Sequence, residues 1–177
     1  MAGSDGIRKG TIADVEELAA LYDAINDHLA ATVNHPGWRK GLYPVRENAQ
    51  RAAQEGTLFV YMVDDNIAGS VILNHEPEYA YYGAAWLIDA EYQDVIVIHT
   101  LVIHPAYLKR GIGYELMRFA ISHAKEQKQK SVRLDVYENN LPAIALYEKC
   151  GFQYIAKADL GLGCYGLDYF LLYEYVL

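Results

Sequence analysis

The sequence predicts an α/β protein of the three-layer α+β kind, in which a mixed, mostly antiparallel sheet carries helices on both faces. Two observations lead to this fold class. The chain has 177 residues, 53% of them hydrophobic, which suits a single folded domain spanning residues 1–177. Apolar residues alternate with a period of two in some segments and follow helical spacing in others, in the order β-α-α-β-β-β-α-β-α-β-β.

The first half of the chain contains three predicted strands and two predicted helices. Apolar side chains between Val15 and Leu29 recur at helical spacing and indicate the first helix. Pro44 suits the first turn of the second helix, and Gly56 ends it. The strands are predicted at residues 7–10, 58–63 and 67–73, with a turn at 64–66 between the last two.

The second half begins with a long, aromatic and acidic connection at residues 75–92, in which we expect a helical turn near 84–88. Connections of this length inside compact domains are often functional. After it the periodicity predicts strands at 95–103, 131–136, 152–157 and 170–176, and helices at 115–128 and 141–150. Gly151 stands where the last helix should stop.

Composition narrows the function classes. The formal net charge is −8, which argues against nucleic-acid binding and is compatible with a cationic substrate. No apolar stretch approaches 18 residues and no signal pattern opens the chain, so we expect a cytoplasmic protein without a membrane partner. The histidines and the two cysteines, Cys150 and Cys164, show no metal-ligand spacing, so no metal is expected.

The most informative segment is the turn that follows the strand at 95–103. Residues 109–114 read Lys-Arg-Gly-Ile-Gly-Tyr and lead into a helix. Backbone N–H groups at a helix start lack intrahelical acceptors, the helix dipole adds positive charge there, and glycine permits close approach. The segment therefore predicts a phosphate site and favours a diphosphate as its ligand.

Two common phosphate motifs do not fit this turn. A nucleotide P-loop needs Gly-Lys followed by Ser or Thr, and neither follows Gly113. The dinucleotide fingerprint needs a third glycine where Leu116 stands. Asp135 nearly satisfies the acidic position of that fingerprint, and we interpret this spacing as coincidental.

A second motif follows 30 residues later. Its members read Asn-x-x-Ala-x-x-Leu-Tyr-x-x-x-Gly-Phe and are Asn140, Ala143, Leu146, Tyr147, Gly151 and Phe152. With the glycine turn, this pattern resembles the GNAT superfamily of N-acetyltransferases, which use acetyl-coenzyme A. The match covers roughly residues 96–155. One residue departs from the family pattern: Leu108 stands where the family usually has Arg or Gln.

The resemblance implies a GNAT-like fold and an N-acetyltransferase that moves an acetyl group from acetyl-CoA directly to a primary amine. It implies that the backbone of Leu101, Val102 and Ile103 pairs with the pantetheine arm as an added strand. The pyrophosphate ligands are then the amides of Lys109, Arg110, Gly111, Ile112, Gly113 and Tyr114. Asn140 should hydrogen-bond the coenzyme arm, although an Asn before a helix is commonly an N-cap.

Amide formation from a thioester needs an acid for the leaving thiolate and a base for the amine. Tyr147 matches the family's acid, and its phenol carries a proton at neutral pH. The alternative is a tyrosine that simply packs on the sheet. For the base, His99 shares a predicted strand face with Val97 and Leu101, and Asp135 is the rival. A structural His99, or a base provided by water, stays open.

The acceptor should be a small-molecule or peptide amine bound by variable segments. The candidates are residues 34–43, with Trp38 and Tyr43, and residues 76–92, with Tyr82 and Trp86. Aromatic rings with carboxylates suit an amine with an apolar body. An exposed aromatic strand at 170–176 would suit a homodimer. Two rival functions remain: a coenzyme A-binding sensor or structural domain without catalysis, and transfer of a longer acyl group.

Overall fold

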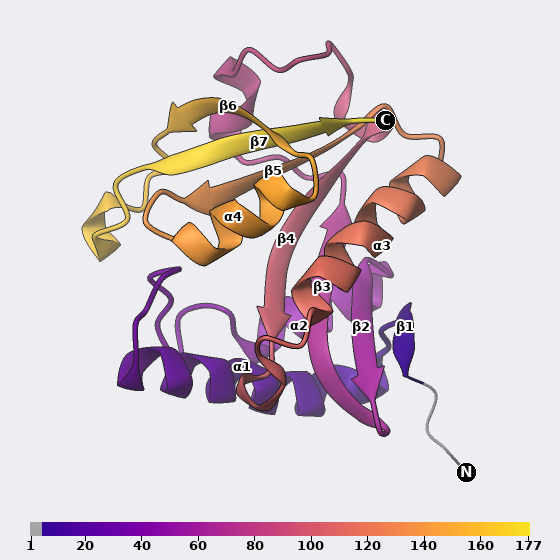
Figure 1. Cartoon of the computed structure of the whole chain (residues 1–177), viewed down its shortest axis with the longest axis vertical. Coiled ribbons are helices and arrows are strands. Elements are labelled where there is room, and N and C mark those ends of the chain that lie inside the picture. Colours follow the sequence, from indigo (N-terminus) through magenta and orange to yellow (C-terminus); the bar gives the residue numbers. More distant parts are fainter. Residues whose placement is uncertain (1–4) are drawn as a thin grey trace. The chain divides into compact units, whose positions relative to one another are not determined.

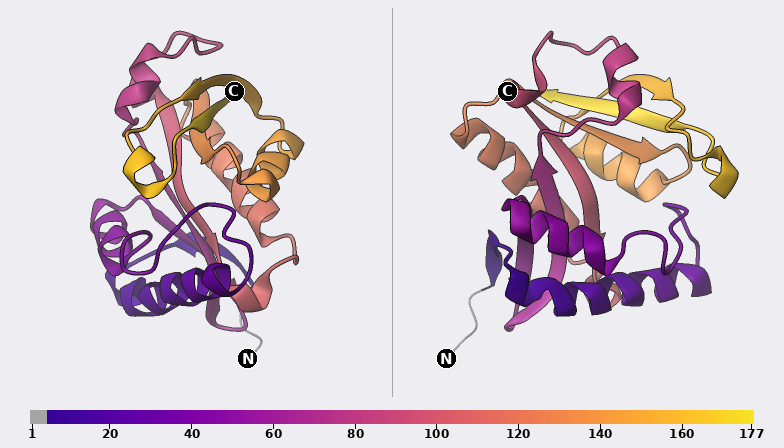
Figure 2. Two further views of the ribbon diagram at one scale, coloured as in Figure 1. Left: turned by 90° about the vertical axis from the view of Figure 1, so that its left-hand side faces the viewer. Right: turned by 180° about the vertical axis from the view of Figure 1, so that it is seen from behind.

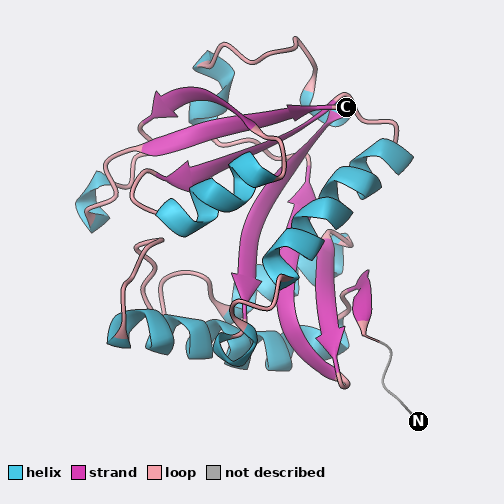
Figure 3. Ribbon diagram, viewed as in Figure 1, coloured by secondary structure: helices cyan, strands magenta, loops and turns pink. Residues whose placement is uncertain are grey.

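The computed structural model describes residues 5–177. Its helices and strands follow one another in the predicted order (Figures 1 and 3). They are β1 (Gly6–Lys9), α1 (Val15–Ala31), α2 (Arg46–Glu55), β2 (Leu58–Val63), β3 (Asn66–Asn74), β4 (Val95–Ile103), α3 (Ile112–Glu126), β5 (Ser131–Tyr137), α4 (Leu141–Lys149), β6 (Gln153–Ala158) and β7 (Phe170–Val176).

Hydrogen bonds order the strands as β1-β2-β3-β4-β5-β7-β6 in one seven-stranded sheet. β4 and β5 are parallel, whereas β1–β2, β2–β3, β5–β7 and β6–β7 are antiparallel. The predicted fold class, a mixed and mostly antiparallel sheet with helices, is therefore confirmed.

The chain divides into two compact units. The first contains the residues up to 34 together with 38–73 and 99–116, and the second contains 35–37, 74–98 and 117–177. Strand β4 and helix α3 each contribute residues to both units. That residues 1–177 form one domain stays a prediction.

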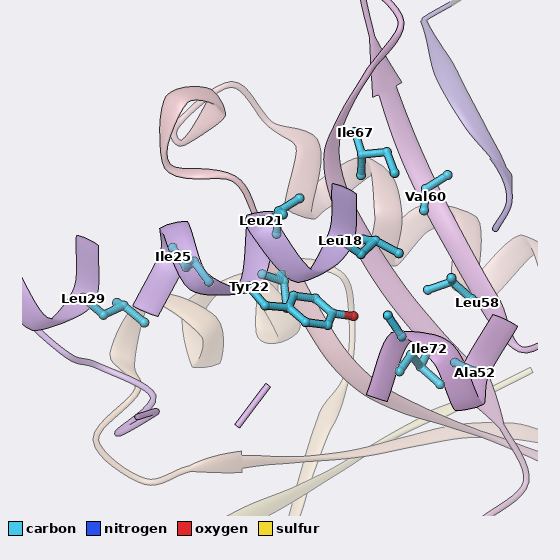
Figure 4. Packing of buried hydrophobic residues seen from close by; sticks show 12 residues of the cluster. Leu18, Leu21, Tyr22, Ile25, Leu29, Ala52, Leu58, Val60, Ile67 and Ile72 are labelled. Carbon is cyan, nitrogen blue, oxygen red and sulfur yellow. The ribbon is translucent and has the colours of Figure 1, made fainter. Parts of the chain in front are cut away.

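In the first unit, helix α1 packs its apolar face on strands β2 and β3 (Figure 4). Leu18 and Tyr22 of α1 are completely buried, as are Leu58 and Val60 of β2. Helix α2 lies beside α1 and adds Ala52 to the same cluster (Figure 2). Because a fully buried leucine contributes about 1.5–3 kcal/mol, this cluster fixes both helices on the strands.

The start of α2 differs from the prediction. The helix begins at Arg46, so Pro44 precedes it instead of occupying its first turn. The reason is a side-chain cap: the Val45 amide donates to Oδ1 of Asn48 at 2.7 Å, which places the helix start after Val45. Gly56 ends the helix as predicted, with a φ of 72°.

In the second unit, a buried ion pair joins the neighbouring strands β5 and β7. Nε of Arg133 lies 2.9 Å from Oε1 of Glu174, and the two side chains are 2% and 0% exposed. The same carboxylate accepts a hydrogen bond from the Leu87 amide at 2.6 Å, and the guanidinium donates to the Ile88 carbonyl at 2.9 Å. These bonds tie the connection between β3 and β4 to the sheet.

The predicted helical turn at residues 84–88 is wrong in position. The connection contains 3₁₀ turns at Tyr79–Gly83 and Tyr92–Asp94 instead. Leu87 and Ile88 direct their main-chain groups to the buried ion pair. A helical turn over 84–88 would direct those groups to its own backbone, which explains why the turn forms earlier.

Candidate active site

The turn between β4 and α3 has the backbone geometry of an anion site. Lys109 and Gly111 have φ angles of 62° and 82°. The Glu115 amide donates to the Gly111 carbonyl at 3.0 Å, so α3 begins at Ile112, three residues before its predicted start at 115. N–H groups in the first turn of a helix have no intrahelical acceptor and lie at the positive end of the helix dipole. An anion placed here would meet main-chain donors.

Gly111 leaves room for a ligand at this turn. A Cβ atom built on Gly111 would meet no atom within 4 Å, and its positive φ is one that L side chains rarely adopt. Lys109 and Arg110 are exposed, and the Arg110 guanidinium lies 5.1 Å from the centre of the Tyr107 ring. Open space at Gly111, two preceding cations and the start of a helix are together suited to a diphosphate.

Strand β4 departs from regular geometry at Thr100, whose φ is +50°. Half-buried and buried residues nevertheless alternate from His99 to Ile103. His99 is half-buried. Among the described residues, β4 pairs with β5 only over Val95–Val97, opposite Ser131–Arg133.

Helix α4 carries Tyr147 and begins after Asn140. The Asn140 side chain accepts a hydrogen bond from the Ala143 amide at 3.4 Å, which is the N-cap role that the sequence left open. Tyr147 is 7% exposed, and its ring centre lies 6.3 Å from that of Phe152. Gly151 follows the helix with a φ of 93°, as predicted for a stop. Contact of Asn140 with coenzyme stays a prediction.

Asp135 of β5 is held by a tyrosine from the connection before β4. The Tyr81 hydroxyl donates to Oδ2 of Asp135 at 2.6 Å, and Tyr81 is completely buried. Burial, followed by the charge of Asp135, raises the pKa of Tyr81 well above its ordinary value. The phenol therefore keeps its proton at neutral pH and remains the donor in its hydrogen bond to Asp135.

The aromatic residues predicted to bind the acceptor are divided between the two units. In the first, the rings of Trp38 and Tyr43 pack edge to face with centres 5.7 Å apart. The hydroxyls of Tyr43 and Thr100 are hydrogen-bonded, with 2.6 Å between their oxygens. Tyr43 thus has a contact within the protein that the sequence did not predict.

In the second unit, Trp86 and Tyr82 differ in exposure. The Trp86 indole donates to the Tyr81 carbonyl at 2.8 Å, and the Arg133 guanidinium lies 4.4 Å from its ring centre. Tyr82 is 69% exposed, and its ring centre is 5.4 Å from that of Tyr92. The contacts of Trp86 explain its position without a ligand, whereas Tyr82 is available to one.

The family assignment agrees with this geometry. The model of the acetyltransferase (GNAT) family matches residues 18–152, a span that includes the β4–α3 turn and helix α4. The chain belongs to the GNAT acetyltransferase family. The resemblance read from the two motifs is thereby confirmed, and this family uses acetyl-CoA.

Several curated proteins resemble this GNAT chain. Mycothiol acetyltransferase of Corynebacterium glutamicum (strain R) is 26% identical over 153 residues, which cover 84% of this chain and 47% of that protein. Streptothricin acetyltransferase of Escherichia coli is 26% identical over 99 residues, or 56% and 48% of the two chains. Spermine/spermidine N(1)-acetyltransferase of Bacillus subtilis (strain 168) is 36% identical over 58 residues, or 32% and 38%. The chain spans less than half the length of these relatives.

Solved structures show the same fold. The GNAT family acetyltransferase of Streptococcus agalactiae superposes with a TM-score of 0.81 at 19% identity, covering 100% of this chain and 98% of the other. Salmonella typhimurium yncA, solved with its cofactor acetyl-CoA, superposes with a TM-score of 0.69 at 14% identity, covering 99% and 95%.

Two residues with a bearing on the site escaped the sequence analysis. Thr100 carries no signal for a positive φ, because this conformation is expected of Gly, Asn or Asp. Tyr81 belongs to an evident aromatic cluster, but nothing in the sequence connects it with Asp135. His104, directly after β4, accepts a hydrogen bond at its Nδ1 from the Ala106 amide at 3.0 Å.

Neither a metal-ligand cluster nor a membrane-spanning helix occurs within residues 5–177. No group of three or more His, Cys, Asp or Glu side chains in this range could hold a metal ion. Over the same residues, every helix is too short or too polar to cross a membrane.

Proposed function

We propose that this GNAT protein transfers an acetyl group from acetyl-CoA to a primary amine, in a complex that holds both substrates at once. The observation that carries the proposal is the β4–α3 turn. It combines two positive φ angles, open space above Gly111 and a helix that begins at the next residue. These are the features that a diphosphate needs in order to reach main-chain donors.

In this proposal the amides of residues 109–114 bind the coenzyme pyrophosphate, and the main chain of residues 101–103 pairs with the pantetheine arm. Leu108 stands where the family usually has Arg or Gln and offers no polar group there, while Lys109 and Arg110 keep positive charge in the turn. We therefore expect the replacement to alter coenzyme affinity without abolishing binding.

Acetyl-CoA supplies the acetyl group activated as a thioester. The amine nitrogen bonds to the acetyl carbon as the carbon–sulfur bond breaks, and two protons must then move. His99 or Asp135, directly or through water, accepts the proton that the amine loses. Tyr147 donates its phenolic proton to the leaving sulfur.

The acceptor in this proposal is a cationic amine with an apolar portion. The net charge of −8 favours cations near the protein. Tyr82 offers an exposed aromatic face for such a molecule. The spermine/spermidine and streptothricin acetyltransferases among the relatives support an amine of this class.

Titration with coenzyme A tests the binding step. We expect saturable binding to the wild-type chain and at least about tenfold weaker binding to Gly111→Val, because valine fills the open space and resists a positive φ. Gly161→Val is the matched control, since Gly161 has a similar φ of 77° and equally open surroundings. Equal effects of the two variants, or no saturable binding by the wild type, would refute the coenzyme site.

Release of free thiol from acetyl-CoA in the presence of polyamines, an arylamine and peptide N-termini tests the chemistry. We expect turnover with at least one amine, and a lower kcat in Tyr147→Phe by roughly ten- to a hundredfold with coenzyme binding nearly unchanged. Coenzyme binding without turnover across the panel would favour the sensor instead. An unaltered rate in Tyr147→Phe would remove that residue from the mechanism.

A further inference from the structure

Thr100 adopts a backbone conformation that its side chain disfavours. Its φ is +50°, and a positive φ is a genuine outlier for a β-branched residue. Conformations of this kind are unfavourable and persist only where surrounding contacts enforce them. Thr100 is 8% exposed and lies directly before Leu101, where the predicted pantetheine-binding segment begins.

Tyr43 contacts the side chain of Thr100 directly. Its hydroxyl lies 2.6 Å from Oγ1 of Thr100, a short hydrogen bond across 57 positions of sequence. The carbonyl of Tyr43 accepts from the side-chain amide of Asn26 at 3.3 Å, and Asn26 is buried in α1. Trp38 packs edge-on against the Tyr43 ring. Tyr43 is therefore fixed to α1 at its main chain and to β4 at its hydroxyl.

Strand β3 packs closely against the main chain of residues 102–104. A Cβ atom built on Gly69 of β3 would lie 3.0 Å from the Val102 carbonyl oxygen and 2.9 Å from the Ile103 side chain. The His104 amide donates to the Ala68 carbonyl at 2.9 Å. The main chain of residues 102–104 is thus held against β3, and only Leu101 separates Thr100 from this segment.

We propose that Tyr43 is a positioning residue for the acyl donor: its hydroxyl holds Thr100 at positive φ and so orients the main-chain groups of residues 101–103. This inference rests on the proposed function, which assigns those groups to the pantetheine arm. It changes the role of Tyr43 from an acceptor-binding residue to one that acts through Thr100.

A double-mutant cycle on protein stability measures the coupling. Tyr43→Phe and Thr100→Val each remove one hydroxyl, and each should raise the equilibrium constant for unfolding by roughly five- to thirtyfold. In the Thr100→Val background, Tyr43→Phe should have little further effect. Tyr61→Phe, a half-buried tyrosine of β2, is the control and should not couple to Thr100→Val. Fully additive effects of Tyr43→Phe and Thr100→Val would overturn the inference.

Turnover distinguishes positioning from simple stabilisation. Thr100→Gly and Thr100→Val both lose the hydroxyl, but glycine keeps a positive φ without strain and valine does not. Thr100→Gly should therefore retain at least about threefold more kcat than Thr100→Val, even though glycine packs less well in a buried position. An equal or reversed order would overturn the positioning role.

Coenzyme A titration separates this inference from the proposed function. If the wild type fails to bind coenzyme A or to acetylate any amine of the panel, the proposed function is wrong, and the assignment of Tyr43 to the acyl donor is wrong with it. If the wild type binds and turns over, but the cycle is additive or the Gly–Val order is reversed, only the role of Tyr43 is wrong.

Discussion

Asp14 shows how one buried carboxylate can organise a chain segment. Asp14 is 8% exposed, and its carboxylate accepts four hydrogen bonds. Two come from the Arg8 guanidinium at 2.7 and 2.9 Å, and two come from the amide and the hydroxyl of Thr11 at 2.7 and 3.1 Å. The Arg8 hydrogen bonds, opposed by burial, hold the pKa of Asp14 below its ordinary value. Strand β1 is thereby connected to the start of helix α1.

The lowered pKa of Asp14 predicts how the stability of the fold changes as the pH falls. A carboxylate whose folded pKa is depressed stabilises the fold above its unfolded pKa, about 4, and loses that contribution as pH falls through the folded value. Asp14→Asn should reduce the free energy of unfolding at pH 7 by about 1–2 kcal/mol in urea titrations. The difference from wild type should shrink as the pH falls below about 4.

A matched variant controls for the loss of a negative charge. Asp23 is an exposed carboxylate of α1, and Asp23→Asn should change the unfolding free energy by less than about 0.5 kcal/mol at every pH. A deficit in Asp14→Asn that stays constant down to pH 2 would show that the ionised carboxylate is not its source.

At the scale of helices and strands, the sequence correctly predicts the elements whose limits depend on local periodicity. The predicted strands at 58–63, 95–103 and 170–176 coincide with β2, β4 and β7. Each is a run of apolar residues bounded by turn residues, so its limits are encoded locally. The glycine turn and the N-cap before α4 are local in the same sense.

Features that depend on distant partners escaped prediction. Thr100 is hydrogen-bonded to Tyr43, 57 residues away, and Asp135 is hydrogen-bonded to Tyr81, 54 residues away. Periodicity places Arg133 in a strand but does not say that Glu174 lies opposite it. An Arg or a Glu in a sequence can equally be an exposed residue or a member of a buried ion pair. The two cases can be told apart only when the spatial partner is known.

The buried ion pair predicts how the β3–β4 connection is held. Glu174→Gln should lower the free energy of unfolding by about 3 kcal/mol, because it leaves the Arg133 charge buried without a counter-charge. The Leu87 amide, which donates to Glu174, should also exchange its hydrogen faster.

An exposed ion pair of the same unit is the control for this prediction. Lys130 and Asp94 form an ion pair of 2.7 Å with side chains 56% and 36% exposed. Asp94→Asn should cost less than about 1 kcal/mol and leave exchange at Leu87 unchanged. Similar losses in Glu174→Gln and Asp94→Asn would contradict a special role for burial.

At the scale of the whole molecule, charge is the property that bears on function. The chain has 23 acidic and 15 basic residues, so its field attracts cations and repels anions such as coenzyme A. Lys109 and Arg110 place positive charge at the one turn where an anion is expected. The positive turn would attract the anionic acetyl donor, and the negative charge of the rest of the molecule would attract a cationic acceptor.

This charge distribution predicts a dependence on salt that differs between acceptors. Because salt screens charges over about 10 Å at 0.1 M, raising ionic strength from about 20 to 500 mM should increase KM several-fold for a cationic polyamine. KM for an arylamine, which is uncharged at neutral pH, should change less than about twofold under the same conditions. Steady-state kinetics at saturating acetyl-CoA measure both. Equal responses of the two acceptors would mean that the net charge of −8 serves no purpose in acceptor recognition.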